Sequence, residues 1–127
     1  MEKTAEHAGN QSSAPKIVRK VWGYENILVN EPEYCCKELH IYAKKKCSLH
    51  YHKRKKETFV VQSGLVRLEQ RDMRDAPIDE LLKVGEQRTI MPMTPHRFSS
   101  TYGAVLLEVS TRHDDADVVR IEPSGDA

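Results

Sequence analysis

Short runs of alternating apolar and polar residues, broken by glycine, proline and charged stretches, make up most of the chain. The clearest run is YCCKELHIYA, residues 34–43, because four of its residues share one face of a predicted strand: Cys35, Lys37, Leu39 and Ile41. Similar runs occur at 16–30, 58–63, 65–70, 78–92, 96–100, 104–110 and 117–123. None sustains a 3.6-residue apolar period over three turns, although 78–85 could form one helical turn. The pattern predicts an all-β barrel or sandwich.

Two glycines separate pairs of these predicted strands. Gly64 lies between 58–63 and 65–70, and Gly103 lies between 96–100 and 104–110. Tight turns between antiparallel strands favour glycine, so each glycine is predicted to join a hairpin. The polar stretch 71–77 is predicted to be a loop.

The length of 127 residues suits one domain with one core. Residues 1–15 are rich in small polar residues and end at a proline, which predicts a disordered N-terminal tail. The barrel domain is expected over residues 16–123, followed by a short C-terminal tail at 124–127. The sequence shows no internal repeat and no second domain.

Composition and charge exclude several classes of function. The net charge of +1 gives no electrostatic reason to expect a nucleic-acid or membrane partner. No stretch approaches the ~20 apolar residues of a membrane-spanning helix, and the N-terminus lacks the apolar core of a secretory signal. The three cysteines are odd in number and two are adjacent, which predicts a reduced, cytoplasmic protein.

The stretch CSLHYHKRKKETFVVQSG, residues 47–64, carries the candidate chemistry. His50 and His52 lie two residues apart, so their side chains project from the same face of a strand. Glu57 follows the short basic segment KRKK, and His96 begins a later strand. Three imidazoles and one carboxylate can bind a divalent transition metal (Mn, Fe, Zn, Ni or Co) and leave positions open for substrate. The alternative for each histidine is a hydrogen-bonded packing residue in the barrel core.

The same residues resemble the signatures of the cupin superfamily. The stretch 50–64 has the pattern His-x-His-x4-Glu-x6-Gly of the first signature, and GEQRTIMPMTPH, residues 85–96, is similar to the second. The resemblance implies a single-domain cupin, a double-stranded β-helix or jelly-roll barrel, with a metal held by His50, His52, Glu57 and His96. Lys44 and Met93 occupy two positions where the signatures have glycine, which predicts altered turns there.

A narrower resemblance covers residues from about Val21 to Glu122. The chain is similar to the cupin domain of type II mannose-6-phosphate isomerases, which forms the C-terminus of bifunctional mannose-1-phosphate guanylyltransferases, and to small stand-alone relatives. It is carried by the segments VWGYE, YCCKELHIYAKKKCSLHYH, PHRFSS and LLEVSTRHDDADVVRIEPS. The resemblance implies a metal-dependent enzyme that interconverts aldose and ketose forms of a sugar or sugar phosphate through an enediolate.

Three further residues are candidates for catalysis. Lys37 is the best candidate for the base, because it shares a face with the inward apolar residues of its strand and matches the family's lysine; the alternative is a solvent-exposed lysine. The resemblance implies a catalytic or phosphate-orienting role for Arg97, although strict alternation points it away from the face of His96. Glu108 lies in an apolar run and is expected to be a second acid–base group or the partner of Lys37. His40 and His113 are expected to be structural or surface residues.

Two other functions remain open from the sequence. An iron-dependent cupin dioxygenase would use the same metal ligands and consume oxygen with its substrate. A non-catalytic sugar-binding cupin would bind its ligand without turnover. The expected partners are a small sugar or sugar phosphate and a second copy of the chain, with residues 21–30 pairing at a sheet edge in a homodimer.

Overall fold

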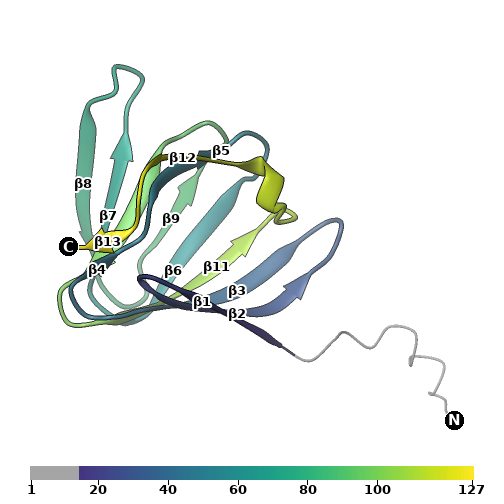
Figure 1. The fold of residues 1–127 in the computed structure, drawn as a ribbon, viewed down its shortest axis with the longest axis horizontal. Coiled ribbons are helices and arrows are strands. Elements are labelled where there is room, and N and C mark those ends of the chain that lie inside the picture. The colour runs from purple at the N-terminus through teal and green to yellow at the C-terminus, as the bar shows by residue number, and fades with distance from the viewer. Residues whose placement is uncertain (1–14) are drawn as a thin grey trace, which may run out of the picture.

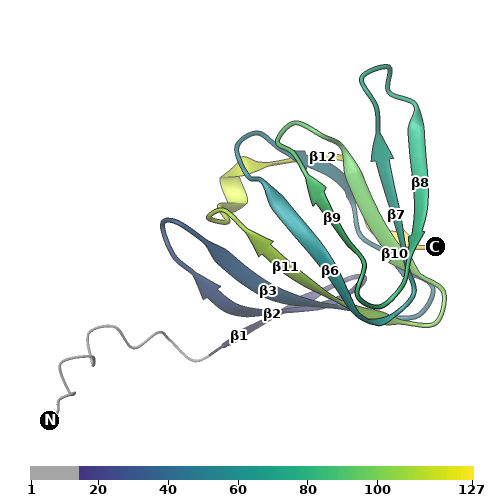
Figure 2. The same ribbon diagram turned by 180° about the vertical axis from the view of Figure 1, so that it is seen from behind.

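Two β-sheets face each other around a central cavity in residues 15–127, the part of the chain that the computed structural model describes (Figure 1). The predicted N-terminal tail, except Pro15, lies outside these residues. Figure 2 shows the same sheets from behind, with the β7–β8 hairpin extending beyond the rest of the barrel. Among the described residues, no helix has the length and apolar character needed to cross a membrane.

The first sheet has the strand order β1-β2-β3-β11-β6-β9, with every neighbouring pair antiparallel. Its strands are β1 (Lys16–Lys20), β2 (Gly23–Asn30), β3 (Cys35–Ile41), β6 (Glu57–Gly64), β9 (Gln87–Ile90) and β11 (Ala104–Ser110).

The second sheet has the order β12-β5-β10-β4-β13, with β7 paired to β10 and β8 paired to β7. Its strands are β4 (Lys45–Lys46), β5 (Leu49–His52), β7 (Val66–Arg71), β8 (Pro77–Leu82), β10 (His96–Ser100), β12 (Val118–Glu122) and β13 (Gly125–Asp126). A short 3-10 helix, η2 (Asp115–Asp117), precedes β12.

The alternation predicted for residues 34–43 is confirmed. The four residues assigned to the inner face of β3 are all buried, whereas the residues between them are half-buried. The inner faces of both sheets supply the apolar core, whose members include Trp22, Leu39, Phe59, Leu68 and Phe98. Lys37 is 1% exposed and lies within this face, directly opposite Glu108 on β11.

The two predicted hairpins at Gly64 and Gly103 are wrong. β6 and β7 lie in different sheets, as do β10 and β11, so each glycine marks a corner between the sheets. Both glycines have positive φ, 79° and 98°. They also touch, because a Cβ on Gly64 would lie 2.4 Å from the carbonyl oxygen of Gly103. Glycine is therefore required for two corners that pack against each other.

Two other regions differ from the sequence-based expectation. Residues 78–85 do not form a helical turn, because β8 pairs along its length with β7 across the predicted loop at 71–77. The segment 124–127, expected to be a tail, contains β13, which pairs with β4. The strand predicted near 117–123 is confirmed as β12.

Lys44 and Met93, which replace the glycines of the cupin signatures, keep the backbone conformation that favours glycine. Their φ angles are 62° and 69°. Both residues therefore adopt the left-handed backbone without glycine, and the prediction that these turns differ from those of the signatures stays a prediction. The backbone N–H of Met93 donates to the carbonyl of His52 at 2.7 Å, so this turn is tied directly to a predicted ligand strand.

The substitution Met93→Gly is expected to raise the free energy of unfolding by about 1 kcal/mol, because it relieves left-handed strain at a side chain that packs little. Met93 is 58% exposed. Chemical denaturation measures the change. Met73→Gly is the matched control, because Met73 is also an exposed turn methionine but does not have a positive φ. An equal gain in both variants, or none in Met93→Gly, would contradict this account.

Candidate metal centre

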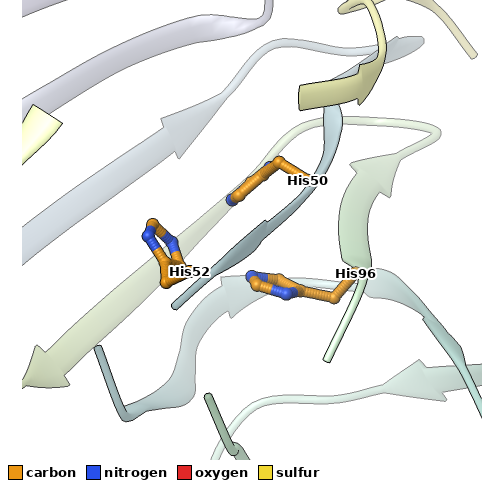
Figure 3. Close-up of side chains that lie close together, drawn as sticks. All are labelled: His50, His52 and His96. Carbon is orange, nitrogen blue, oxygen red and sulfur yellow. The ribbon is translucent and has the colours of Figure 1, made fainter. Parts of the chain in front are cut away.

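Three histidines from two adjacent strands meet inside the barrel. His50 and His52 lie on β5, and His96 begins β10, where it stands opposite His50 in the strand register. One nitrogen from each imidazole lies within 4.8 Å of the corresponding nitrogens of the other two. Figure 3 shows the three rings directed toward a common region. The prediction that these histidines converge is confirmed, and together they could hold a divalent metal ion.

Two of the imidazoles are oriented by backbone carbonyls. Nδ1 of His50 lies 2.8 Å from the carbonyl oxygen of Ser48, and Nδ1 of His96 lies 2.9 Å from that of Thr94. A carbonyl only accepts, so each Nδ1 carries the proton and donates it. Each Nε2 is left with a free lone pair, which is the arrangement typical of a histidine that ligates a metal.

Glu57, the first residue of β6, brings a carboxylate to the same place. Its Oε2 lies 2.9 Å from His96 Nε2 and 3.3 Å from His52 Nε2. Within residues 15–127, neither Glu57 Oε2 nor His96 Nε2 has a hydrogen-bond partner, although both are buried. A buried polar atom without a partner is energetically costly, so both atoms are candidates for metal ligands. Two ligand atoms that coordinate one ion at right angles, each about 2.1 Å from it, lie roughly 3 Å apart, which agrees with the 2.9 Å between these two atoms. The residues present therefore fit a first-row divalent metal.

The protonation states of His50 and Glu57 suit metal binding. Burial lowers the pKa of His50 to about 3, and the neighbouring His96 adds to the effect, so His50 is neutral at physiological pH. Burial alone would raise the pKa of Glu57, but the adjacent imidazoles of His52 and His96, and then Lys55, hold it well below its usual range. Neutral imidazoles and an ionised carboxylate are the forms that coordinate a metal.

A cavity of about 330 Å³ opens beside this cluster and is lined by His50, His52 and Glu57. Its volume is at the lower end of the range for small-molecule sites. Lys37 and Glu25 also line it, and Lys37 Nζ lies 3.3 Å from Glu25 Oε1. Lys37 therefore faces the cavity as predicted, but its partner is Glu25 and not Glu108.

Glu108 is paired with a different lysine. Its Oε2 lies 2.6 Å from Nζ of Lys55 and accepts a hydrogen bond from Ser110 Oγ at 3.1 Å. Glu108 is 3% exposed and also lines the cavity. The carboxylate in this apolar run is thus compensated by a buried ammonium group, that of Lys55 and not that of Lys37.

Lys55 and His113 are site residues that the sequence interpretation missed. Lys55 lies in the KRKK segment, which reads as a solvated turn, yet it is 3% exposed and lines the cavity. His113 was expected to be structural or on the surface, but its Nδ1 lies 3.1 Å from Lys55 Nζ and it too lines the cavity. Burial, followed by the charge of Lys55, lowers the pKa of His113.

Arg97 does not join the cluster. Its guanidinium donates to the backbone carbonyls of Cys47 and Pro123 and pairs with Glu122 Oε1 at 2.8 Å. It therefore lies on the opposite side of β10 from His96, as strict strand alternation predicts, and the role implied by the family resemblance is not supported by its position.

The three cysteines are free thiols and not nucleophiles of this site. Burial raises the pKa of Cys47 to about 12, and burial also raises the pKa of Cys35. A thiol whose pKa is raised in this way stays protonated near neutral pH, which makes it a poor nucleophile.

Comparison with known proteins supports the fold. No protein-family model matches the chain, and no curated protein sequence is significantly similar to it. Among solved structures, oxalate decarboxylase from Bacillus subtilis at pH 4.6 superimposes with a TM-score of 0.75 at 16% identity, over 84% of this chain and 30% of that one. The oxalate decarboxylase formate complex from Lactobacillus farciminis has a TM-score of 0.74 at 14% identity, over 84% of this chain and 34% of that one.

These neighbours are cupins, and the similarity confirms the predicted all-β cupin fold. The chain spans about a third of the length of the oxalate decarboxylases that it matches. At these identities the similarity concerns the fold alone, so the argument for function depends on the residues of the cavity.

Proposed function

We propose that the protein is a metal-dependent enzyme that interconverts the aldose and ketose forms of a sugar or a sugar phosphate. The observation that carries this proposal is the buried Lys37–Glu25 pair, which lines the same cavity as His50, His52 and Glu57. A metal-binding cluster alone suits many cupin reactions. A separate proton-transfer pair facing the same space is what an aldose–ketose conversion requires.

The metal would be held by His50, His52, His96 and Glu57. When bound, it supplies Lewis acidity, which stabilises negative charge on the carbonyl and hydroxyl oxygens of the sugar. The remaining chemistry belongs to side chains that do not ligate it.

Lys37 and Glu25 can move the proton between the two sugar carbons. Their side chains are 2% and 15% exposed, and Nζ and Oε1 are 3.3 Å apart. If the shared proton passes from Lys37 Nζ to Glu25 Oε1, a neutral amine faces the cavity and can take a proton from C2. The resulting ammonium, whose protons exchange with solvent, then donates a proton to C1 while the O2 hydroxyl proton moves to O1. The same group therefore acts first as base and then as acid.

Three basic residues lie in the more exposed part of the cavity lining, which also contains Val21 and Asp115. Arg19 and Arg120 are exposed, Lys20 is half-buried, and all three line the cavity from β1 and β12. Arginine and lysine side chains attract and bind anionic groups, which favours a phosphorylated sugar over an unmodified one.

The proposal is tested by incubating metal-loaded protein with mannose 6-phosphate, lyxose and related sugars in D2O. We expect formation of the ketose together with deuterium incorporation at the exchanged carbon, both followed by NMR. Protein shown by elemental analysis to be metal-loaded, yet without turnover or exchange across the panel, would refute the isomerase function. Substrate-dependent oxygen uptake by the iron-loaded form would instead support the dioxygenase alternative.

A further inference from the structure

The turn between β5 and β6 buries one of its four basic residues. Lys53, Arg54 and Lys56 are exposed, whereas the side chain of Lys55 is 2% exposed and lines the cavity. This turn connects His52 to Glu57 and therefore joins two of the proposed metal ligands. A buried ammonium group is energetically costly unless it is well paired, so the partners of Lys55 indicate what it does in the fold.

The turn is held in place by Asp117 at the end of η2. The carboxylate of Asp117 accepts hydrogen bonds from the backbone N–H groups of Lys53, Arg54 and Lys55 at 3.0 to 3.1 Å. Asp117 is itself 3% exposed. Three backbone donors converging on one carboxylate fix the path of the turn, and this path directs the Lys55 side chain inward.

The three donors of the Lys55 ammonium group face three acceptors. Nζ lies 2.6 Å from Glu108 Oε2, 3.1 Å from His113 Nδ1 and 3.6 Å from Glu57 Oε1. Nδ1 of His113 acts as an acceptor, since its Nε2 lies 2.8 Å from Asp115 Oδ1 and donates to that carboxylate. Lys55 is therefore a bridge between the proposed ligand Glu57 and the second buried carboxylate, Glu108.

Glu57 divides its two oxygens between this bridge and the histidines. Oε1 lies toward Lys55, while Oε2 lies toward His52 and His96. Glu108 is a diagonal neighbour on the same inner face, because it stands opposite Phe59 in the register of β11 and β6. Diagonal neighbours are about 7–8 Å apart between Cα atoms, within reach of long side chains.

We infer that Lys55 is a positioning residue that determines the carboxylate ligands of the metal centre. It holds Glu57 with one oxygen toward the imidazoles, and it retains Glu108 so that this second carboxylate does not enter the coordination sphere. The resulting donor set is three imidazoles and one carboxylate oxygen, with positions left for substrate. This inference concerns the metal centre and is independent of the reaction that the cavity supports.

The test uses Co²⁺, whose visible absorption spectrum reports the type and number of its ligands. In Lys55→Met the released Glu108 is expected to coordinate, so the Co²⁺ bands should shift from those of the wild-type protein. In Lys55→Met/Glu108→Gln no second carboxylate is present, so the wild-type spectrum should return. The affinity for Co²⁺ in the double variant should remain about tenfold weaker, because Glu57 has lost the partner that orients it.

The double variant distinguishes a positioning role of Lys55 from an effect of its charge on metal binding and from an effect on folding. It removes one positive and one negative charge, so the net charge near the metal is conserved, and removing both partners of a pair leaves neither one buried alone. If Lys55→Met does not fold, the spectrum and affinity of the double variant decide the question. Lys53→Met, an exposed lysine of the same turn, serves as the control and should match the wild-type protein. A wild-type spectrum in Lys55→Met, or wild-type affinity in the double variant, would overturn the inference.

Discussion

Replacing His52 by alanine is expected to abolish measurable binding of Mn²⁺ or Co²⁺. Loss of an outer-shell partner costs about 10–100-fold in metal affinity, so loss of a ligand should cost more than about 100-fold. In the wild-type protein, metal at 100 times its dissociation constant should add about 2.7 kcal/mol to the stability, and this gain should disappear in the variant. Isothermal titration calorimetry and thermal unfolding with and without metal measure both effects.

His40→Ala is the matched control for this prediction. His40 also lies on a strand of the barrel, but it stacks on Tyr24 with ring centroids 4.3 Å apart on the outer face of β3. Its removal should leave the metal affinity unchanged. Equal loss of affinity in both variants would point to general unfolding, and unchanged affinity in His52→Ala would remove His52 from the metal centre.

Replacing Lys37 by methionine is expected to lower kcat strongly while the protein still binds its metal. General acid–base groups contribute about 10²–10⁴-fold to the rate, so kcat should decrease by about that factor. The methionine side chain keeps most of the apolar volume on the inner face of β3 but cannot exchange a proton with Glu25. The measurement is aldose–ketose conversion on the sugar that gives turnover with the wild-type protein, with metal content determined in parallel.

Lys53→Met again provides the control, because Lys53 is exposed and lies outside the cavity lining. Turnover by Lys37→Met within tenfold of the wild-type value would show that the base lies elsewhere. Equal loss of metal and of activity would show instead that Lys37 supports the metal centre and does not transfer the proton.

The metal centre was predictable because its geometry is mostly local. The spacing of His50 and His52 places them on one strand face, and the return of Glu57 needs only the short turn that follows. The face on which Lys37 lies also follows from alternation within a single strand. Alternation also predicts the position of Arg97, which lies on the opposite face of β10 from His96. The family resemblance, in contrast, implied that Arg97 takes part in the site.

Strand pairing was not predictable from the same local pattern. The corners at Gly64 and Gly103 read as hairpin turns, because each glycine follows one strand and precedes another. The strands on either side of each glycine pair with other strands and not with each other, and the two corners contact one another although they are 39 residues apart by sequence number. A pattern read within one short segment does not include such a contact.

Lys55 was missed for a related reason. A run of four basic residues is usually a solvated turn, and nothing within the run distinguishes Lys55 from its neighbours. Its burial depends on Asp117, which binds the turn from 62 residues away, and on the carboxylate of Glu108. The one available signal was Glu108 itself, since a carboxylate in an apolar strand requires a buried partner of opposite charge.

The most direct test of the metal centre is anomalous diffraction from crystals grown with excess Mn²⁺ or Co²⁺. We predict one strong anomalous peak inside the barrel, bonded to His50, His52, His96 and a single oxygen of Glu57, with the cavity beside it open to a ligand. Fully ordered side chains with no peak between them, or a peak bound only at other residues, would contradict the assignment of this site.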